Sequence, residues 1–176
     1  MKIDNRHERS FRTEADSLGS ILDTLSGPDD RLWPRDTWPP MHFDTSLKPG
    51  ARGGHGVVGY EVEEYAPGRR AIFRFDGTGI TADLDGRHYF EVIRRNSRVI
   101  LRHVIDAECG IKAWLKWKIV IEPLHDALLE DALDHAEQAM FGCVSRPARW
   151  SLRVKILRKI LAKKRLRRQE DVIIRK

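Results

Sequence analysis

The sequence predicts an α+β fold in which a curved antiparallel sheet packs against one long helix near the C-terminus. Three observations predict this fold. Residues 41–107 hold strand-like segments that are rich in large apolar side chains and are separated by turn residues. An amphipathic stretch with helical periodicity, Ile111–Phe141, follows them directly. No second helix of similar size is predicted, so this single helix must cover the sheet.

The first 40 residues are predicted to form one strand and two short helices. Residues 5–15 alternate in hydropathy, which is typical of a strand. Residues 17–26 are typical of a short helix, which Gly27 and Pro28 end. Pro28 also favours the first turn of a second short helix, because a backbone N–H is not needed there.

Between residues 41 and 107, short hairpin-type connections join consecutive segments, so the sheet is expected to be antiparallel. The connections include Ala-Pro-Gly, two Asp-Gly pairs and Arg-Arg-Asn-Ser. The predicted strands cover residues 41–47, 58–65, 69–75, 87–93 and 98–107.

The stretch Ile111–Phe141 spans about 45 Å if it forms one continuous helix. Pro123 removes one backbone donor and should bend the helix rather than end it, because the apolar stripe keeps its phase across the proline. The predicted apolar stripe consists of Trp114, Trp117, Ile121, Leu124, Leu128, Ala132, His135 and Ala139. The predicted polar side carries Lys112, Lys116, Asp126, Glu130, Asp134 and Glu137.

Charge divides the chain into two parts. Residues 1–145 hold 19 Lys and Arg against 24 Asp and Glu, a net charge of −5, whereas residues 146–176 hold 13 against 2, a net charge of +11. We therefore predict a folded domain over residues 1–145 and a basic tail over residues 146–176. The charged N-terminus is unlike a signal peptide, and no apolar run approaches the roughly 20 residues of a membrane span, so a cytoplasmic location is expected. Cys109 and Cys143 are expected to be free thiols.

The tail is predicted to form a basic amphipathic helix. Residues 146–168 hold 11 Lys and Arg and no acidic residue, and an apolar stripe that includes Trp150 runs along them. This pattern is typical of a helix that lies on an anionic membrane surface. Docking of the tail on its own domain or on a partner subunit is an equal alternative, and nucleic acid is a weaker one. The predicted membrane-surface residues are Trp150, Arg153, Lys155, Arg158, Lys159, Lys163, Lys164 and Arg165.

Short motifs exclude several classes of function. Residues 54–59 match GxGxxG, but a loop precedes them and a strand-like segment follows, whereas a dinucleotide site needs a strand before and a helix after. Residues 76–86 lack the acidic spacing of a calcium-binding EF-hand. The sequence contains no GxSxG, HExxH or Walker motif. No cofactor and no metal site are predicted.

Two histidines of the last predicted hairpin are candidate functional residues. His88 shares a strand face with Phe90, and His103 shares one with Leu101, so both should point into the core. A four-residue turn at 94–97 would place His88 directly opposite His103. Two adjacent imidazoles can bind a metal, shuttle a proton or hold a polar ligand group. Because no third ligand follows from the spacing, hydrogen-bonded histidines of a core or cavity are the leading interpretation.

The order of elements resembles the helix-grip fold of the SRPBCC superfamily. This superfamily includes START lipid-transfer domains, birch-pollen-allergen-like proteins and aromatic polyketide cyclases. The resemblance covers about residues 5–143, and is greatest to a bacterial branch described as polyketide cyclase/dehydrase and lipid transport. The segments that carry it are GARGGHG at 50–56, VEEYAPGRR at 62–70, HYFEV at 88–92 with LRHVIDA at 101–107, RLWPRDTWPPM at 31–41 and PLHDALLEDALD at 123–134.

The resemblance implies a cavity between sheet and helix that admits a lipid or polyketide-like molecule, so that the protein is a carrier or sensor. One alternative is a cyclase- or dehydratase-type enzyme that uses His88 and His103 as acid–base residues. Another is a non-catalytic interaction protein tethered by its tail. For each residue, simple filling of the core is the alternative role. The residues suited to line the cavity are Trp33, Trp38, Tyr60, Phe73, Phe75, His88, Phe90, Leu101, His103, Trp117, Ile121, Leu124 and Leu128.

Overall fold

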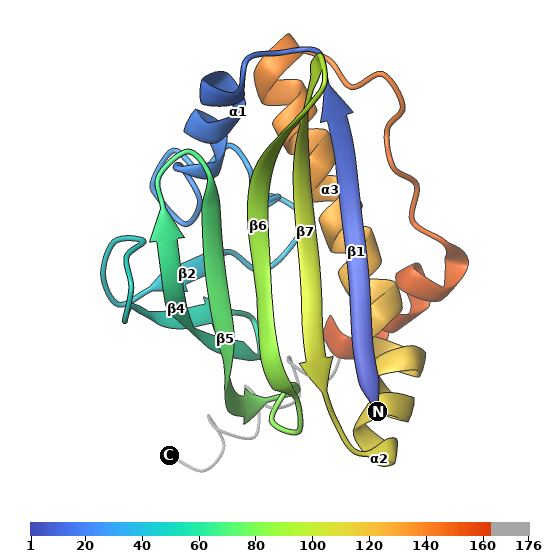
Figure 1. Cartoon of the computed structure of the whole chain (residues 1–176). Coiled ribbons are helices and arrows are strands. Elements are labelled where there is room, and N and C mark those ends of the chain that lie inside the picture. Colours follow the sequence, from blue (N-terminus) through green and yellow to red (C-terminus); the bar gives the residue numbers. More distant parts are fainter. Residues whose placement is uncertain (163–176) are drawn as a thin grey trace, which may run out of the picture.

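The computed structural model describes residues 1–162, which form one seven-stranded antiparallel sheet with a long helix across one face (Figure 1). The strand order is β1-β7-β6-β5-β4-β3-β2, so the first strand pairs with the last. The predicted α+β class, a curved sheet around one long helix, is confirmed. The elements are β1 (Lys2–Phe11), α1 (Ala15–Leu22), β2 (Met41–Phe43), β3 (Arg52–His55), β4 (Val58–Ala66), β5 (Arg70–Gly79), β6 (Asp85–Arg95), β7 (Arg98–Glu108), α2 (Ile111–Lys116), the π-helical segment η1 (Trp117–Ile121) and α3 (Glu122–Phe141).

The N-terminal region differs from the prediction in one element. Only one of the two predicted short helices, α1, is present between β1 and β2. In place of the second helix, the Asp30 carboxylate accepts hydrogen bonds from the backbone N–H groups of Ser26, Leu32 and Trp33. These bonds fold residues 26–33 into turns, because a carboxylate that satisfies nearby backbone donors competes with the helix.

The last hairpin has a tighter turn than predicted. Only Asn96 and Ser97 lie between the paired residues Arg95 and Arg98, so the predicted direct pairing of His88 with His103 is wrong. Asn96 adopts a left-handed conformation with φ of 54°, which asparagine tolerates better than most residues. The register instead places Phe90 opposite His103, and His88 therefore lies diagonal to His103 on the same face of the sheet.

Residues Ile111–Phe141 are helical throughout, but the middle of the helix is irregular. The π-helical segment η1 lies immediately before Pro123 and inserts one extra residue into the turn. The buried stripe of α3 is therefore shifted by about one residue from its predicted positions. The prediction that the stripe keeps its phase across Pro123 is wrong. Predicted positions His135 and Ala139 are partly or fully exposed. The buried residues of α3 are Leu128, Leu129, Ala132, Leu133 and Ala136.

The tail satisfies the backbone groups that this irregular turn leaves free. Pro123 has no N–H to donate, so carbonyl groups one turn earlier lose a partner. The Arg153 guanidinium donates to the carbonyl oxygens of Lys118 at 3.0 Å and Ile119 at 2.7 Å. Residues 144–151 run back along α3, and a helix over residues 152–162 follows them (Figure 1). From residue 146 to residue 158, the tail therefore follows the alternative in which it docks on its own domain.

Candidate functional site

The inner face of the sheet carries most of the predicted cavity residues. Tyr60 on β4, Phe73 and Phe75 on β5, and the four predicted residues of β6 and β7 are all buried between sheet and helix. Trp117 of η1 and Leu128 of α3 are buried opposite them, whereas Ile121 and Leu124 are only partly buried. The four residues of β6 and β7 are His88, Phe90, Leu101 and His103.

The two predicted tryptophans come from the loop between α1 and β2: Trp33 belongs to the same buried cluster as Tyr60 and Phe73, and Trp38 packs against that cluster. Trp33 is buried, packs edge-on against His55 and donates its indole N–H to the Pro39 carbonyl. Trp38 is partly buried and donates its indole N–H to the Asp131 carboxylate at 2.7 Å. Neither side chain has a free indole N–H, and their predicted role in lining a cavity stays a prediction.

His88 and His103 form a hydrogen-bonded pair inside the protein. Nδ1 of His88 and Nε2 of His103 are 3.2 Å apart, and the two side chains are buried. Each neutral imidazole has one donor and one acceptor. Whichever ring donates in the shared bond, the pair is left with one free N–H and one free acceptor nitrogen.

Several polar atoms of this interior have no partner among residues 1–162. They are the Tyr60 hydroxyl, Nε2 of His88, Nδ1 of His103 and Nδ1 of His55. A buried donor or acceptor that is left unpaired costs about 1–3 kcal/mol, so buried polar groups nearly always have a partner in protein, water or ligand. A polar group of a ligand bound at this cluster would therefore form hydrogen bonds with atoms that otherwise have no partner.

Burial keeps the interior histidines neutral. Removal from water lowers the pKa of His88 and of His103 well below the usual 6.5, and neighbouring histidines lower both further. Burial lowers the pKa of His55 to about 4. It also raises the pKa of the Tyr60 hydroxyl well above 10, so this group stays a neutral donor.

The row of imidazoles continues outward from His103 to the edge of the sheet. The ring of His125 on α3 lies 5.0 Å from that of His103 and 6.0 Å from that of His7 on β1. His7 lies between two carboxylates, with Nε2 3.0 Å from Asp126 and Nδ1 2.8 Å from Glu130. Burial disfavours its charged form, but the two hydrogen bonds outweigh burial and raise the pKa of His7 to about 9.

The outer end of the row belongs to a charged ladder that the sequence analysis missed. Alternate residues Asn5, His7 and Arg9 of β1 face the long helix. Two residues of a strand advance about 6.8 Å and four residues of a helix about 6 Å, so the two series stay in step. Asn5 and His7 contact Asp126, His7 and Arg9 contact Glu130, and Arg9 also contacts Asp134 and Glu137. Two sequence patterns indicate this ladder. Acidic residues recur every four positions on the helix, and polar residues occupy alternate positions on the inward face of the first strand.

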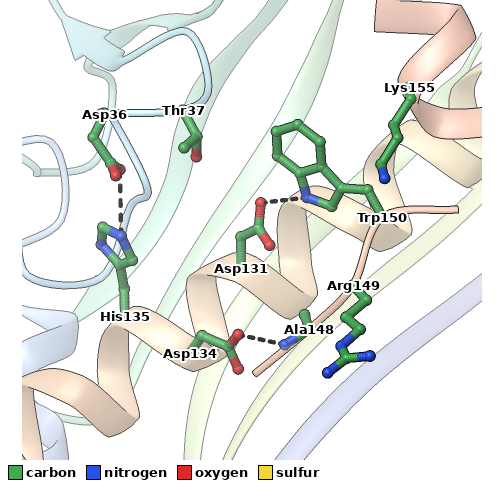
Figure 2. A pocket seen from close by; sticks show the side chains of 9 residues that line it. All are labelled: Asp36, Thr37, Asp131, Asp134, His135, Ala148, Arg149, Trp150 and Lys155. Carbon is green, nitrogen blue, oxygen red and sulfur yellow. Dashed lines mark hydrogen bonds and ion pairs between the residues drawn. The ribbon is translucent and has the colours of Figure 1, made fainter. Parts of the chain in front are cut away.

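The two described hollows of the surface lie outside this interior. One, of about 440 Å³, lies between α3, the loop at Asp36 and the tail at Trp150 (Figure 2). In Figure 2, His135 points to Asp36 and the Trp150 indole to Asp131. The other, of about 470 Å³, lies between the end of β1 and the tail at Arg146. Within residues 1–162, neither hollow is lined by a predicted cavity residue.

The predicted membrane-surface residues fall into three groups. Trp150 and Arg158 pack on the domain: the Arg158 guanidinium lies 4.2 Å from the ring centre of Trp38 and 4.1 Å from that of Trp150. Arg153 contacts the backbone of η1, while Lys155 and Lys159 are exposed. The third group, Lys163, Lys164 and Arg165, lies outside the described residues.

A curved antiparallel sheet that closes on one long helix is a helix-grip fold, so the predicted fold is confirmed. Among solved structures, a Thermobifida fusca protein is similar with a TM-score of 0.59 and 15% identity, over 77% of this chain and 92% of its own. Norcoclaurine synthase from Thalictrum flavum has a TM-score of 0.59 at 11% identity, over 80% of this chain and 85% of its own. CalU16 from Micromonospora echinospora has a TM-score of 0.52 at 13% identity, over 89% of each chain.

No family model matches the sequence, and no curated protein matches it. No helix within residues 1–162 is both long and apolar enough to cross a membrane.

Proposed function

We propose that this protein binds a small hydrophobic or amphipathic molecule, such as a lipid or a polyketide-like compound, between its sheet and its long helix. It acts as a carrier or sensor of that molecule. The helix-grip fold supports ligand binding in general. The observation that carries the proposal is the cluster of buried, unpartnered polar atoms on Tyr60, His88 and His103 within an aromatic interior.

The chemistry of the cluster specifies the polar part of the ligand. The histidine pair offers one donor and one acceptor at its opposite ends, and Tyr60 adds a hydroxyl. A ligand hydroxyl or carbonyl can therefore bond one of the two rings, donating to the free acceptor nitrogen or accepting from the free N–H. The rings of Phe73 and Phe75 stack on His88 at 5.0 and 5.1 Å and suit an apolar or aromatic body.

Binding fits these histidines better than acid–base catalysis does. A general acid must carry a proton at the working pH, and an effective base has a pKa near that pH. Burial lowers the pKa of both His88 and His103 well below 6.5, so neither carries the charge that a proton donor needs near neutrality. The neutral rings retain full hydrogen-bonding capacity.

Admission of a ligand requires part of the wall to move. The interior side chains pack against one another, and Trp117 at the start of η1 is 1% exposed. The π-helical segment η1 replaces regular i→i−4 hydrogen bonds by wider i→i−5 bonds and lies next to a proline, so we expect it to be the part of the long helix that opens at lowest cost.

Mass spectrometry of organic extracts tests the proposal most directly. The full chain is purified without detergent, and extracts of the wild type are compared with those of the double variant Tyr60→Phe/His103→Leu. We expect a compound with an apolar body and a hydroxyl or carbonyl group that is depleted in the variant. Tyr89→Phe is the matched control, because Tyr89 lies between His88 and Phe90 on the opposite face of β6. Extracts without any such compound, together with no binding of added fatty acids or aromatic polyketides, would contradict the proposal.

A second function, contact with an anionic membrane, is favoured by the exposed side of the tail helix. Leu152, Ile156 and Ile160 follow one another at spacings of four and are 74%, 48% and 48% exposed. Exposed Lys155 and Lys159 lie beside them. An apolar stripe flanked by lysines matches an anionic lipid surface in both shape and charge.

Vesicle sedimentation tests this second function. We expect the protein to bind phosphatidylserine-containing vesicles and to be released by salt, with several-fold weaker binding for Leu152→Ser/Ile156→Ser. Val57→Ser is the control, because Val57 is a similarly exposed apolar residue at the β3–β4 turn. Equal binding to neutral phosphatidylcholine vesicles would rule out the electrostatic part.

A further inference from the structure

We propose that His7, His125 and Asp126 bind a divalent transition-metal ion at the place where β1 meets α3. Nε2 of His7 lies 3.0 Å from an oxygen of Asp126, and Nδ1 of His125 lies 4.0 Å from the same oxygen. All three candidate ligand atoms lie within 4.8 Å of one another. Neighbouring ligands of a tetrahedral zinc ion are about 3.3 Å apart, so the ligand atoms must approach one another by at most about 1.5 Å to complete the site.

The His125 side chain is the observation that an ordinary ion pair leaves unexplained. His7, Asp126 and Glu130 satisfy one another by hydrogen bonds. Nδ1 of His125 faces the same carboxylate, is inaccessible to solvent and has no partner within residues 1–162. A cation between Nδ1 of His125, Nε2 of His7 and Asp126 would satisfy all three groups at once.

The surroundings of the three ligands are those that hold metal-binding side chains in place. Nδ1 of His7 is 2.8 Å from Glu130, so that a histidine bound to metal through Nε2 would donate its other N–H to a carboxylate. The Asn5 side-chain amide donates to Asp126 at 2.9 Å and fixes the carboxylate. The Asp126 side chain is 42% exposed, which gives an ion a path from solvent.

The ligand set defines the class of ion. Two imidazoles and one carboxylate suit Zn²⁺, Co²⁺, Ni²⁺ or Fe²⁺, whereas Ca²⁺ and Mg²⁺ prefer oxygen ligands. Three protein ligands leave at least one coordination position for water or another small ligand. Binding displaces the proton that His7 shares with Asp126, so one proton is released for each ion bound.

Cobalt and zinc binding to the full chain tests the proposal. After dialysis against a chelator, the protein is titrated with Co²⁺ and then with Zn²⁺, while visible absorption and heat are recorded. We expect one ion per chain, a spectrum of nitrogen and oxygen ligation, and displacement of Co²⁺ by Zn²⁺. Asp126→Asn and His125→Gln should each weaken binding at least tenfold, and Glu130→Gln about tenfold through the orientation of His7.

His135→Gln is the matched control, because His135 also pairs with an aspartate, Asp36, away from the proposed site. Its cobalt affinity should equal that of the wild type. In the wild type itself, Co²⁺ should shift the nuclear magnetic resonance signals of two imidazoles, a readout that does not depend on variants that fold. Absence of stoichiometric binding, unchanged binding by Asp126→Asn and His125→Gln, or thiolate absorption bands from Cys109 or Cys143 would each overturn the proposal.

Discussion

The two ends of the histidine row hold the same residue type in opposite states. At the outer end, both ring nitrogens of His7 lie within hydrogen-bonding distance of carboxylates, which hold its pKa near 9. At the inner end, His103 shares one nitrogen with His88 and leaves the other unpaired, and burial lowers its pKa well below 6.5. Burial acts on both rings, so the difference comes from the partners.

Two sides of one helix produce this difference. The side of α3 toward the edge strand β1 presents Asp126 and Glu130, which reach His7. The side toward the centre of the sheet presents apolar residues such as Leu128 and Ala132, which cannot pair with an imidazole. The outer side of the interface is therefore built for stability, and the inner side keeps its hydrogen-bonding capacity free at a cost in stability.

Removal of Arg9 should have the largest effect. The Arg9 side chain is 20% exposed and contacts three carboxylates of α3, so Arg9→Met leaves a cluster of unpaired negative charge. We expect a loss of about 3 kcal/mol in the free energy of unfolding, measured by urea denaturation. Arg70→Met is the control: its pair with Glu64 is nearly half exposed and should contribute less than about 1 kcal/mol. Equal losses in the two variants would contradict the assigned importance of the outer side.

Replacement of the histidines themselves should separate the two ends. His7→Leu removes one hydrogen bond from Asp126 and one from Glu130, which keep only Asn5 and Arg9 as donors, and should cost about 2 kcal/mol. The double variant His88→Leu/His103→Leu removes both members of a buried pair and its unpaired atoms, and should be as stable as the wild type or more so. Denaturation of the ligand-free proteins measures both effects. A double variant less stable than His7→Leu would show that the inner pair is structural.

The pH dependence of stability should slope in opposite directions for the two ends. Folding lowers the pKa of His88 and His103, so their contribution to the free energy of unfolding is complete above about pH 6.5. At lower pH this contribution decreases, by up to about 1.4 kcal/mol per pH unit for each ring. Folding raises the pKa of His7 to about 9, so its contribution is complete below about pH 6.5 and is lost as the pH rises to 9. Urea denaturation of chelator-treated protein at about pH 5, 7 and 9.5 measures both slopes. The acid slope should weaken in His88→Leu/His103→Leu, and the alkaline slope should weaken in His7→Leu.

The sequence was sufficient to predict the fold and the inner end of the row. Strand alternation places His88 and His103 on the inward face whatever the length of the turn between them, so this prediction survived the error in register. The tighter turn depended on whether Asn96 adopts a left-handed conformation, which sequence spacing alone does not decide.

The outer end could not be predicted from local patterns, because it joins residues more than 100 positions apart. His7 and Asp126 meet only because β1 closes the sheet beside β7 and brings its inner face to α3. The sequence predicted a polar side of the long helix but no partners for it on the sheet, and in the structure Glu130 pairs with His7 and Asp134 with Arg9. The shift of the stripe in α3 likewise depends on the π-helical turn before Pro123, which has no signature in apolar periodicity.

Replacement of Arg153 should have the smallest effect on stability. It tests whether backbone carbonyl groups, like the histidine side chains, depend on the partners they find. Its guanidinium pairs the carbonyl oxygens of Lys118 and Ile119, so Arg153→Met should cost about 1 kcal/mol. Pro123→Ala restores an N–H that can reach Ile119, so Arg153→Met should cost less in the Pro123→Ala background. A double-mutant cycle measured by urea denaturation gives this coupling. Lys155→Met, at an exposed position of the same helix, controls for loss of charge. If the two changes are additive, Arg153 does not compensate for Pro123, and water pairs the exposed carbonyl groups of this turn instead.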